Sequence, residues 1–159
     1  GLRLGYVVLP EWLQNSFALT KWLSDRHNSI VPQQIALKLI ADGRFEEDCL
    51  RVTHAARARR KVMLDELSRW PQELVEWTPV KAGLQQPVWF KNDIDDLAVF
   101  ERALREGIGV IPISPYYRTD KVRQGLSLSF FQMDAAKLSD GMRKLAQVIT
   151  SLQICESLQ

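Results

Sequence analysis

The sequence is poor in the residues that build metal and disulfide sites. Among 159 residues there are two cysteines, Cys49 and Cys155, and two histidines. The cysteines are far apart and fit neither a metal-binding nor a redox-active spacing. We therefore expect no zinc site and two free thiols, as in a reducing cytoplasm.

A strong charge excess and a long apolar run are also missing. Twenty-one basic and nineteen acidic side chains give a net charge of +2, which does not favour nucleic-acid binding by this chain alone. No apolar stretch approaches the roughly 20 residues of a membrane-spanning helix, and no signal peptide is visible. With 46% hydrophobic and 25% charged residues, the composition is typical of a globular chain with a core and with no membrane partner.

Complete catalytic motifs are absent too. The sequence has no glycine-rich phosphate loop, no nucleophile elbow and no histidine-based triad, so we assign no catalytic and no metal-binding residue. Tyr116 and Tyr117 carry hydroxyls for a ligand, or they cap a core. The pair Asp95 and Asp96 lies where helix capping explains it.

What is present begins with an apolar stretch, GLRLGYVVLP, which predicts a buried strand over residues 1–10. Arg3 is the charge within this strand, and a buried charge needs a partner. Two alternatives follow. Arg3 forms an ion pair with a neighbouring strand, or it forms a fixed site for phosphate or carboxylate.

Helical periodicity follows the strand. We expect a helix over residues 11–24 with a wide buried face, and a second from Pro32 to residue 41 with Ile35, Leu37, Leu39 and Ile40 largely buried. A third, long helix runs from Arg44 to about Trp70. Its apolar positions share one face and are Phe45, Cys49, Val52, Ala56, Met63 and Leu67.

The middle of this long helix is basic, with cations at Arg51, Arg57, Arg59, Arg60 and Lys61. One interpretation is a phosphate-binding face. The other, which we favour, is a solvated face whose cations pair with acids such as Glu46, Glu47 and Asp65.

After Pro71 the pattern changes to short strands and two helices. Strands are predicted over residues 74–81, 87–91, 108–113 and 126–131, and Pro112 makes the third an edge strand or ends it. A helix over 96–106 is capped by Asp93 or Asp95, with Leu97, Val99, Phe100 and Leu104 facing inward and Gly107 after its end. Asp134 caps the last helix, whose apolar face holds Leu138, Met142, Leu145, Ile149 and Leu152.

Six short motifs occur in a characteristic order along the chain: 1–6 with Pro10, 82–84, 107–110, 112–117, 125–126 with Phe130, and 141–146. In this order they resemble the C-terminal part of fold-type I aminotransferases, which depend on pyridoxal 5'-phosphate (PLP). The closest resemblance is to the aminotransferase-like domain of MocR-type regulators in the GntR family, which the motif 112–117, PISPYY, favours.

The resemblance implies an α/β fold: the C-terminal part of a fold-type I PLP-dependent transferase domain, mainly its α+β small domain with a short antiparallel sheet covered by helices. Residues 1–42 would be the end of the PLP-binding large domain, a strand plus two helices. Residues 43–159 would be the long connecting helix and the small domain.

The resemblance also implies a site. Arg3 matches an arginine that contacts the cofactor phosphate, and the Schiff-base lysine would lie a few residues before Gly1. Gly83 and Ser127 match effector-binding positions. Aminotransferases carry an arginine for the substrate carboxylate where this chain has Ser127, so the bidentate clamp is missing.

The function implied is the effector-sensing and dimerisation part of a cytoplasmic MocR-type transcriptional regulator. PLP would bind the full-length parent and not this fragment, and the effector would be an amine or amino acid. DNA would be bound only through an N-terminal winged-helix domain absent here, and the partner would be a second copy. The alternatives are a fragment of a PLP-dependent amino-acid aminotransferase and a stand-alone interaction domain without cofactor.

Overall fold

The computed structural model describes residues 2–118 and 122–156, with side chains to residue 153. The chain divides into two compact units, Gly1–Val52 and Thr53–Gln159, which we describe separately. The boundary between them falls inside helix α3 (Arg44–Leu67). The predicted division after residue 42 concerns the domains of a longer protein and stays a prediction.

Unit 1 contains two helices, α1 (Glu11–Asp25) and α2 (Ile30–Ala41), close to their predicted positions. The predicted buried strand over 1–10 is not formed: residues 2–10 make no strand pairing and are mostly exposed. A strand requires a neighbour for its backbone hydrogen bonds, and unit 1 supplies none in its described part.

The predicted burial of the helices in unit 1 is also wrong for this chain. Neither α1 nor α2 has a buried residue, and Ile35, Leu37 and Ile40 are exposed. The apolar faces are present as the periodicity indicates, but an extended segment, two helices and the N-terminal part of α3 cannot cover them.

Helix α3 confirms the predicted long helix, and its burial changes along its length. Met63 and Leu67 are fully buried, whereas Phe45 and Val52 are exposed. Only the C-terminal end of the predicted apolar face therefore contributes to a core.

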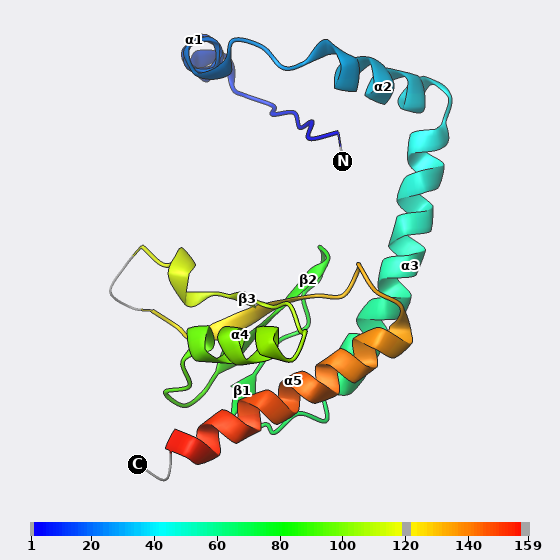
Figure 1. The fold of residues 1–159 in the computed structure, drawn as a ribbon. Helices are drawn as coiled ribbons and strands as arrows, with labels where there is room; N and C mark the ends of the chain where they lie inside the picture. The colour runs from blue at the N-terminus through cyan, green and yellow to red at the C-terminus, as the bar shows by residue number, and fades with distance from the viewer. Residues whose placement is uncertain (1, 119–121, 157–159) are drawn as a thin grey trace. The chain divides into compact units, whose positions relative to one another are not determined.

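Unit 2 is built on a four-stranded antiparallel sheet with strand order β1-β2-β4-β3 (Figure 1). The strands are β1 (Val75–Glu76), β2 (Gln85–Phe90), β3 (Ile111–Pro112) and β4 (Gly125–Ser129). The short antiparallel sheet is confirmed, with β1 and β3 shorter than predicted. Strand β3 lies at the sheet edge, as Pro112 predicts.

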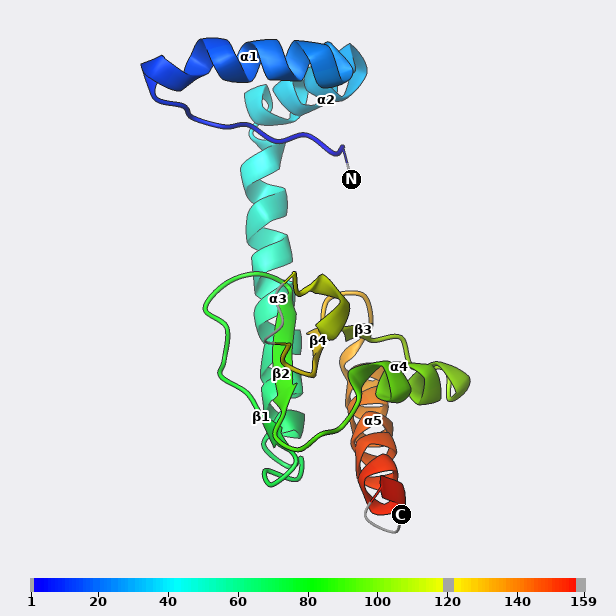
Figure 2. The same cartoon turned by 90° about the vertical axis from the view of Figure 1, so that its left-hand side faces the viewer.

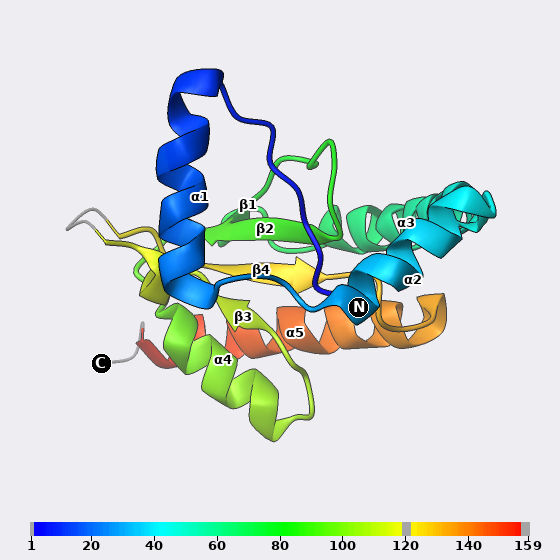
Figure 3. The same ribbon diagram turned by 90° about the horizontal axis from the view of Figure 1, so that it is seen from above.

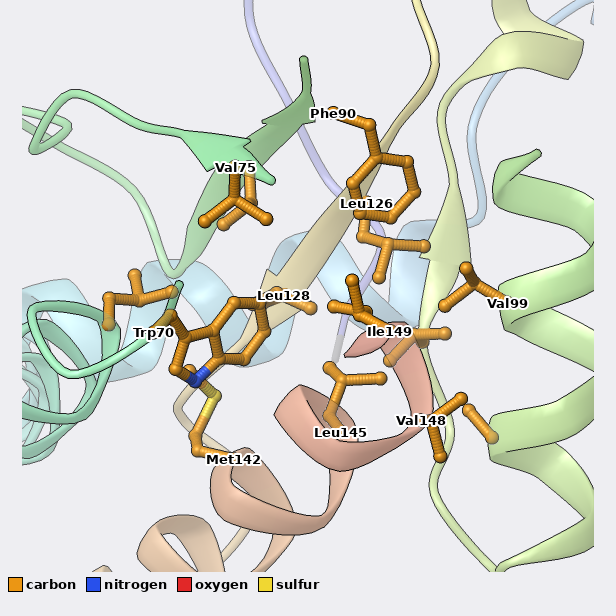
Figure 4. Close-up of a cluster of buried hydrophobic side chains, with 14 of the residues drawn as sticks. Trp70, Val75, Phe90, Val99, Leu126, Leu128, Met142, Leu145, Val148 and Ile149 are labelled. Carbon is orange, nitrogen blue, oxygen red and sulfur yellow. The ribbon is translucent and has the colours of Figure 1, made fainter. Parts of the chain in front are cut away.

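The core lies between one face of this sheet and three helices: the C-terminal half of α3, α4 (Asp96–Arg105) and α5 (Ala135–Glu156). Figures 2 and 3 show α5 and the C-terminal half of α3 alongside the sheet. Alternate residues of the long strands, among them Val88 and Leu126, are fully buried. Leu126 faces Leu145 and Ile149 of α5 (Figure 4).

Helix α4 begins as predicted, because the Asp95 side chain accepts a hydrogen bond from the Leu97 nitrogen at 2.9 Å. Its inward face is rotated from the prediction: Val99 and Ala103 are buried, whereas Leu97 and Leu104 are exposed. Gly107 follows the helix with φ of 76°, the left-handed conformation that its predicted place requires.

Candidate functional site

The second face of the sheet carries the side chains that alternate with the core positions, and most of them are polar or small, with Trp89 and Ile111 as the large apolar members. Ser127 lies on this face in β4, opposite Pro87 of β2 and Ile111 of β3. Its Oγ donates a hydrogen bond to Oε1 of Gln85 at 3.2 Å. The two side chains form a neutral pair where a carboxylate clamp would need a cation.

Gly83, the other predicted effector residue, precedes β2 with φ of 89°. Nothing lies within 4 Å of the position that a Cβ would take, so its backbone faces open space. It lines an open groove with Gln85, Ser129 and Phe131. Gln85 therefore lies in this groove and also contacts Ser127, which connects the two predicted residues through one side chain.

A second cluster lies further along the same face. The Arg123 guanidinium carbon is 4.5 Å from the centre of a Trp89 ring, and Arg123 forms an ion pair with Glu76. Trp89 packs closely against Gly125, because a Cβ there would lie 3.0 Å from the indole Cε3 and 2.5 Å from the Val88 carbonyl oxygen. Ion pairing and ring contact hold this guanidinium in place.

The basic segment of α3 is only partly the solvated, paired face that we favoured. Lys61 pairs with Asp65 at 2.7 Å, as predicted. Arg60 instead donates to the Val80 carbonyl oxygen at 2.5 Å, and Arg59 lies over the ring of Phe131 at 5.3 Å. These two cations face the loop and strands of unit 2 because the C-terminal half of α3 packs there.

Arg3 belongs to unit 1 and is exposed, with φ of 54°. The predicted ion pair is not formed among the described residues, since no acid pairs with Arg3 there, and the predicted site for phosphate or carboxylate stays a prediction. The next residues, Leu4 and Gly5, line an open groove that also holds Lys21 and Arg26. The positive charge of these side chains suits a phosphate group. Arg3, the arginine that the resemblance assigns to the cofactor phosphate, would be one part of such a site.

Asp96 is a residue whose role the sequence did not reveal. It is fully buried. Its Oδ2 accepts hydrogen bonds from the backbone nitrogens of Ile113 (3.0 Å), Ser114 (2.8 Å) and Gly125 (3.1 Å), and Oδ1 accepts from Ser114 Oγ at 2.6 Å. The capping explanation holds for Asp95 alone. Asp96 fixes both ends of the segment that carries Tyr116, which is exposed, and Tyr117, which is half-buried.

Glu66 is a buried carboxyl of unit 2 with a shifted pKa. A hydrogen bond from Ser139 Oγ at 2.6 Å, together with Arg69 at 3.0 Å, lowers the pKa of Glu66 below its usual value, against the opposing effect of burial. The contact joins α3 to α5. Because Glu66 links two helices that pack against the sheet, we assign this carboxyl a role in packing.

Two findings concern the described residues as a group. No set of three histidine, cysteine, aspartate or glutamate side chains among them is placed to hold a metal ion. None of their helices combines the length and the apolar character that crossing a membrane requires.

This sheet, with helices covering one of its faces, has the fold of part of a fold-type I PLP-dependent aminotransferase domain. The structure of the α-aminoadipate aminotransferase LysN from Thermus thermophilus, solved with N-(5'-phosphopyridoxyl)-L-leucine, matches 94% of this chain with a TM-score of 0.81 and 27% identity. The matched part is 38% of that protein.

Sequence comparison places two kinds of protein among the relatives, aminotransferases and MocR/GntR-type regulators. The 2-aminoadipate transaminase of Thermus thermophilus is 28% identical over 96% of this chain and 38% of its own length. The probable rhizopine catabolism regulatory protein MocR of Rhizobium meliloti is 23% identical over 96% of this chain and 31% of its own length. The chain thus spans about a third of these relatives, and no protein-family model matches it.

Proposed function

We propose that this chain is the effector-sensing and dimerisation part of a PLP-dependent regulator of the MocR type. The regulators among its relatives support the class, and the share of their length that it spans supports a role within a larger protein. In this proposal an amine or amino acid binds the full-length protein, shifts the equilibrium between two domain arrangements and thereby changes DNA binding elsewhere in the parent.

The observation that carries the proposal is the Ser127–Gln85 pair. An enzyme that transaminates amino acids must hold a carboxylate firmly, and a guanidinium fork does this best. Here the matching position on β4 holds a hydroxyl bonded to a neutral amide at 3.2 Å, and the guanidinium of Arg123, which precedes the strand, pairs with Glu76. A regulator requires only reversible effector binding, which neutral groups can provide.

PLP would supply an electrophilic carbonyl for an amine when bound to the parent protein. From this chain, Arg3 would hold the cofactor phosphate by charge-assisted hydrogen bonds. Gly83 and Ser127 would orient the effector, Gly83 through its open backbone and Ser127 through its hydroxyl.

The test uses the full-length protein that contains this chain. We expect the absorption band of bound PLP, retardation of DNA from its own promoter region, and a change in retardation on adding the effector amine. Arg3→Gln should lower PLP affinity about tenfold or more, and Arg44→Gln, at an exposed position of the same unit outside the groove, serves as the matched control. A protein that neither binds PLP nor retards DNA would contradict the proposal.

The second candidate is an amino-acid aminotransferase, favoured by the similarity to the 2-aminoadipate transaminase. Steady turnover of an amino acid and an oxo acid by the full-length protein, without DNA retardation, would select it. A dimer is expected in either case and is checked by light scattering.

A further inference from the structure

Arg59 is a half-buried cation of the basic α3 segment without a paired acid among the described residues, whereas Arg57, which also has no paired acid there, is exposed. Lys61 is paired with Asp65, and Arg60 is bonded to a backbone carbonyl. Arg59 is half-buried over the Phe131 ring, and no acidic side chain among the described residues pairs with it. A half-buried guanidinium without an acceptor is unfavourable, which indicates a missing anionic partner.

Phe131, the ring beneath Arg59, is also a wall of the open groove that Gly83 lines. Leu84 adds apolar surface to this groove, and Gln85 and Gln132 add side-chain amides. Gly83 leaves open space where a side chain would project. The groove therefore combines an apolar wall, two amides and an adjacent guanidinium.

The residues that line this groove are all uncharged. Arg59 borders it. Contact with the ring occupies the face of a guanidinium and leaves the N–H donors in its plane, where they match a carboxylate in bidentate fashion.

We propose that this groove binds a small carboxylate with an apolar or aromatic body. The carboxylate lies at Arg59, the body packs against Phe131 and Leu84, and the amides of Gln85 and Gln132 contact its polar groups. This site shares Gly83 and Gln85 with the proposed effector site and rests on that part of the proposed function, but its binding requires neither the cofactor nor DNA, and it lies entirely within unit 2.

The test is a titration of the 159-residue chain followed by backbone amide NMR. The probe is 3-phenylpropanoate, and its neutral amide, 3-phenylpropanamide, is the matched ligand control. We expect saturable shifts at Gly83, Leu84, Ser129 and Gln132 with the carboxylate, and at least tenfold weaker binding of the amide.

Three variants locate the anion contact. Arg59→Gln should weaken carboxylate binding about tenfold or more, and Arg59→Lys, which keeps the charge and loses the fork, should weaken it less. Arg57→Gln removes the same charge from an exposed position of the same helix and should change binding by less than about twofold.

Several results would overturn the proposal: no saturable shift up to ~10 mM probe, equal binding of the amide and the carboxylate, or equal weakening in the Arg57 and Arg59 variants. If Arg59→Gln fails to fold, two measurements still test the proposal. One compares the binding of the two probes by the unaltered chain, and the other measures carboxylate binding by the Arg59→Lys variant. Loss of PLP or DNA binding by the full-length protein would leave this test unaffected, so the two proposals fail separately.

Discussion

The Asp96 carboxylate accepts a hydrogen bond from the backbone nitrogen of Gly125 at 3.1 Å, joining the first residue of α4 to the first residue of β4. The same oxygen also holds Ile113 and Ser114, which follow β3. One buried side chain therefore fixes the start of the strand that carries Ser127 and the turn after the neighbouring edge strand.

Asp96→Asn should lower the free energy of unfolding of unit 2 by about 2–4 kcal/mol, because an amide nitrogen would replace one of two acceptor oxygens facing buried donors. Asp95→Asn is the matched control: it is the adjacent carboxyl, and asparagine is an equally good N-cap, so its effect should be near zero. Urea unfolding followed by circular dichroism measures both. Equal effects of the two variants would show that Asp96 acts only as a helix-end residue.

Gly125→Ala should destabilise the sheet by about 1–3 kcal/mol through overpacking. The added Cβ would lie 2.5 Å from the Val88 carbonyl oxygen and 3.0 Å from the Trp89 ring, so backbone as well as side chain must move. Gly109→Ala, which meets nothing within 4 Å, is the control. Thermal unfolding of the two variants checks the difference, and an unchanged melting temperature for Gly125→Ala would contradict the close packing.

Gly141→Ala should instead stabilise the chain by about 0.5–1 kcal/mol. Gly141 lies inside α5, nothing is within 4 Å of its added Cβ, and alanine is the better helix former. Gly107→Ala provides the opposite control, because φ of 76° strains any residue with a side chain. Urea titration should show a higher midpoint for the first variant and a lower midpoint for the second.

Glu66 should make stability depend on pH in the acid range. Its folded-state pKa is lowered below its usual value of 4.5 by Ser139 and Arg69, so it stabilises the fold fully above that value. This contribution is lost as the pH falls through the folded-state pKa. Glu66→Gln should therefore be less stable than the unaltered chain at pH 7, with the difference shrinking on acidification.

The measurement is the unfolding free energy of both proteins between pH 7 and pH 3. Asp65→Gln, at an exposed neighbour whose pair with Lys61 lies on the surface, should show a much smaller pH-dependent difference. A difference for Glu66→Gln that grows toward acid pH would reverse the assigned direction of the pKa shift.

Local chemistry made much of this fold predictable from the sequence. Capping aspartates such as Asp95 and a terminal glycine such as Gly107 place helix ends within a residue or two, and Pro112 correctly indicates an edge strand. The alternation of LSLSFF likewise predicts that Ser127 lies on the face opposite the core. These features depend on contacts between near neighbours in the chain.

Properties that depend on distant partners were harder to predict. Burial of Ile35 or Leu37 depends on what covers α2, and unit 1 provides no cover among its described residues. The role of Asp96 arises from donors 17 to 29 residues away, and that of Arg59 from Phe131 across the fold. Periodicity shows which face is apolar, and it carries no information about which charged side chain a distant loop will meet.

The two outer strands of the sheet, β1 and β3, are each two residues long, and β3 contains Pro112, which has no backbone N–H. An edge of this kind offers almost no template for another strand. The sheet is therefore protected against edge-to-edge aggregation and strand exchange. Copies of this chain that associate will do so through side-chain surfaces, and a peptide ligand will not bind by extending the sheet.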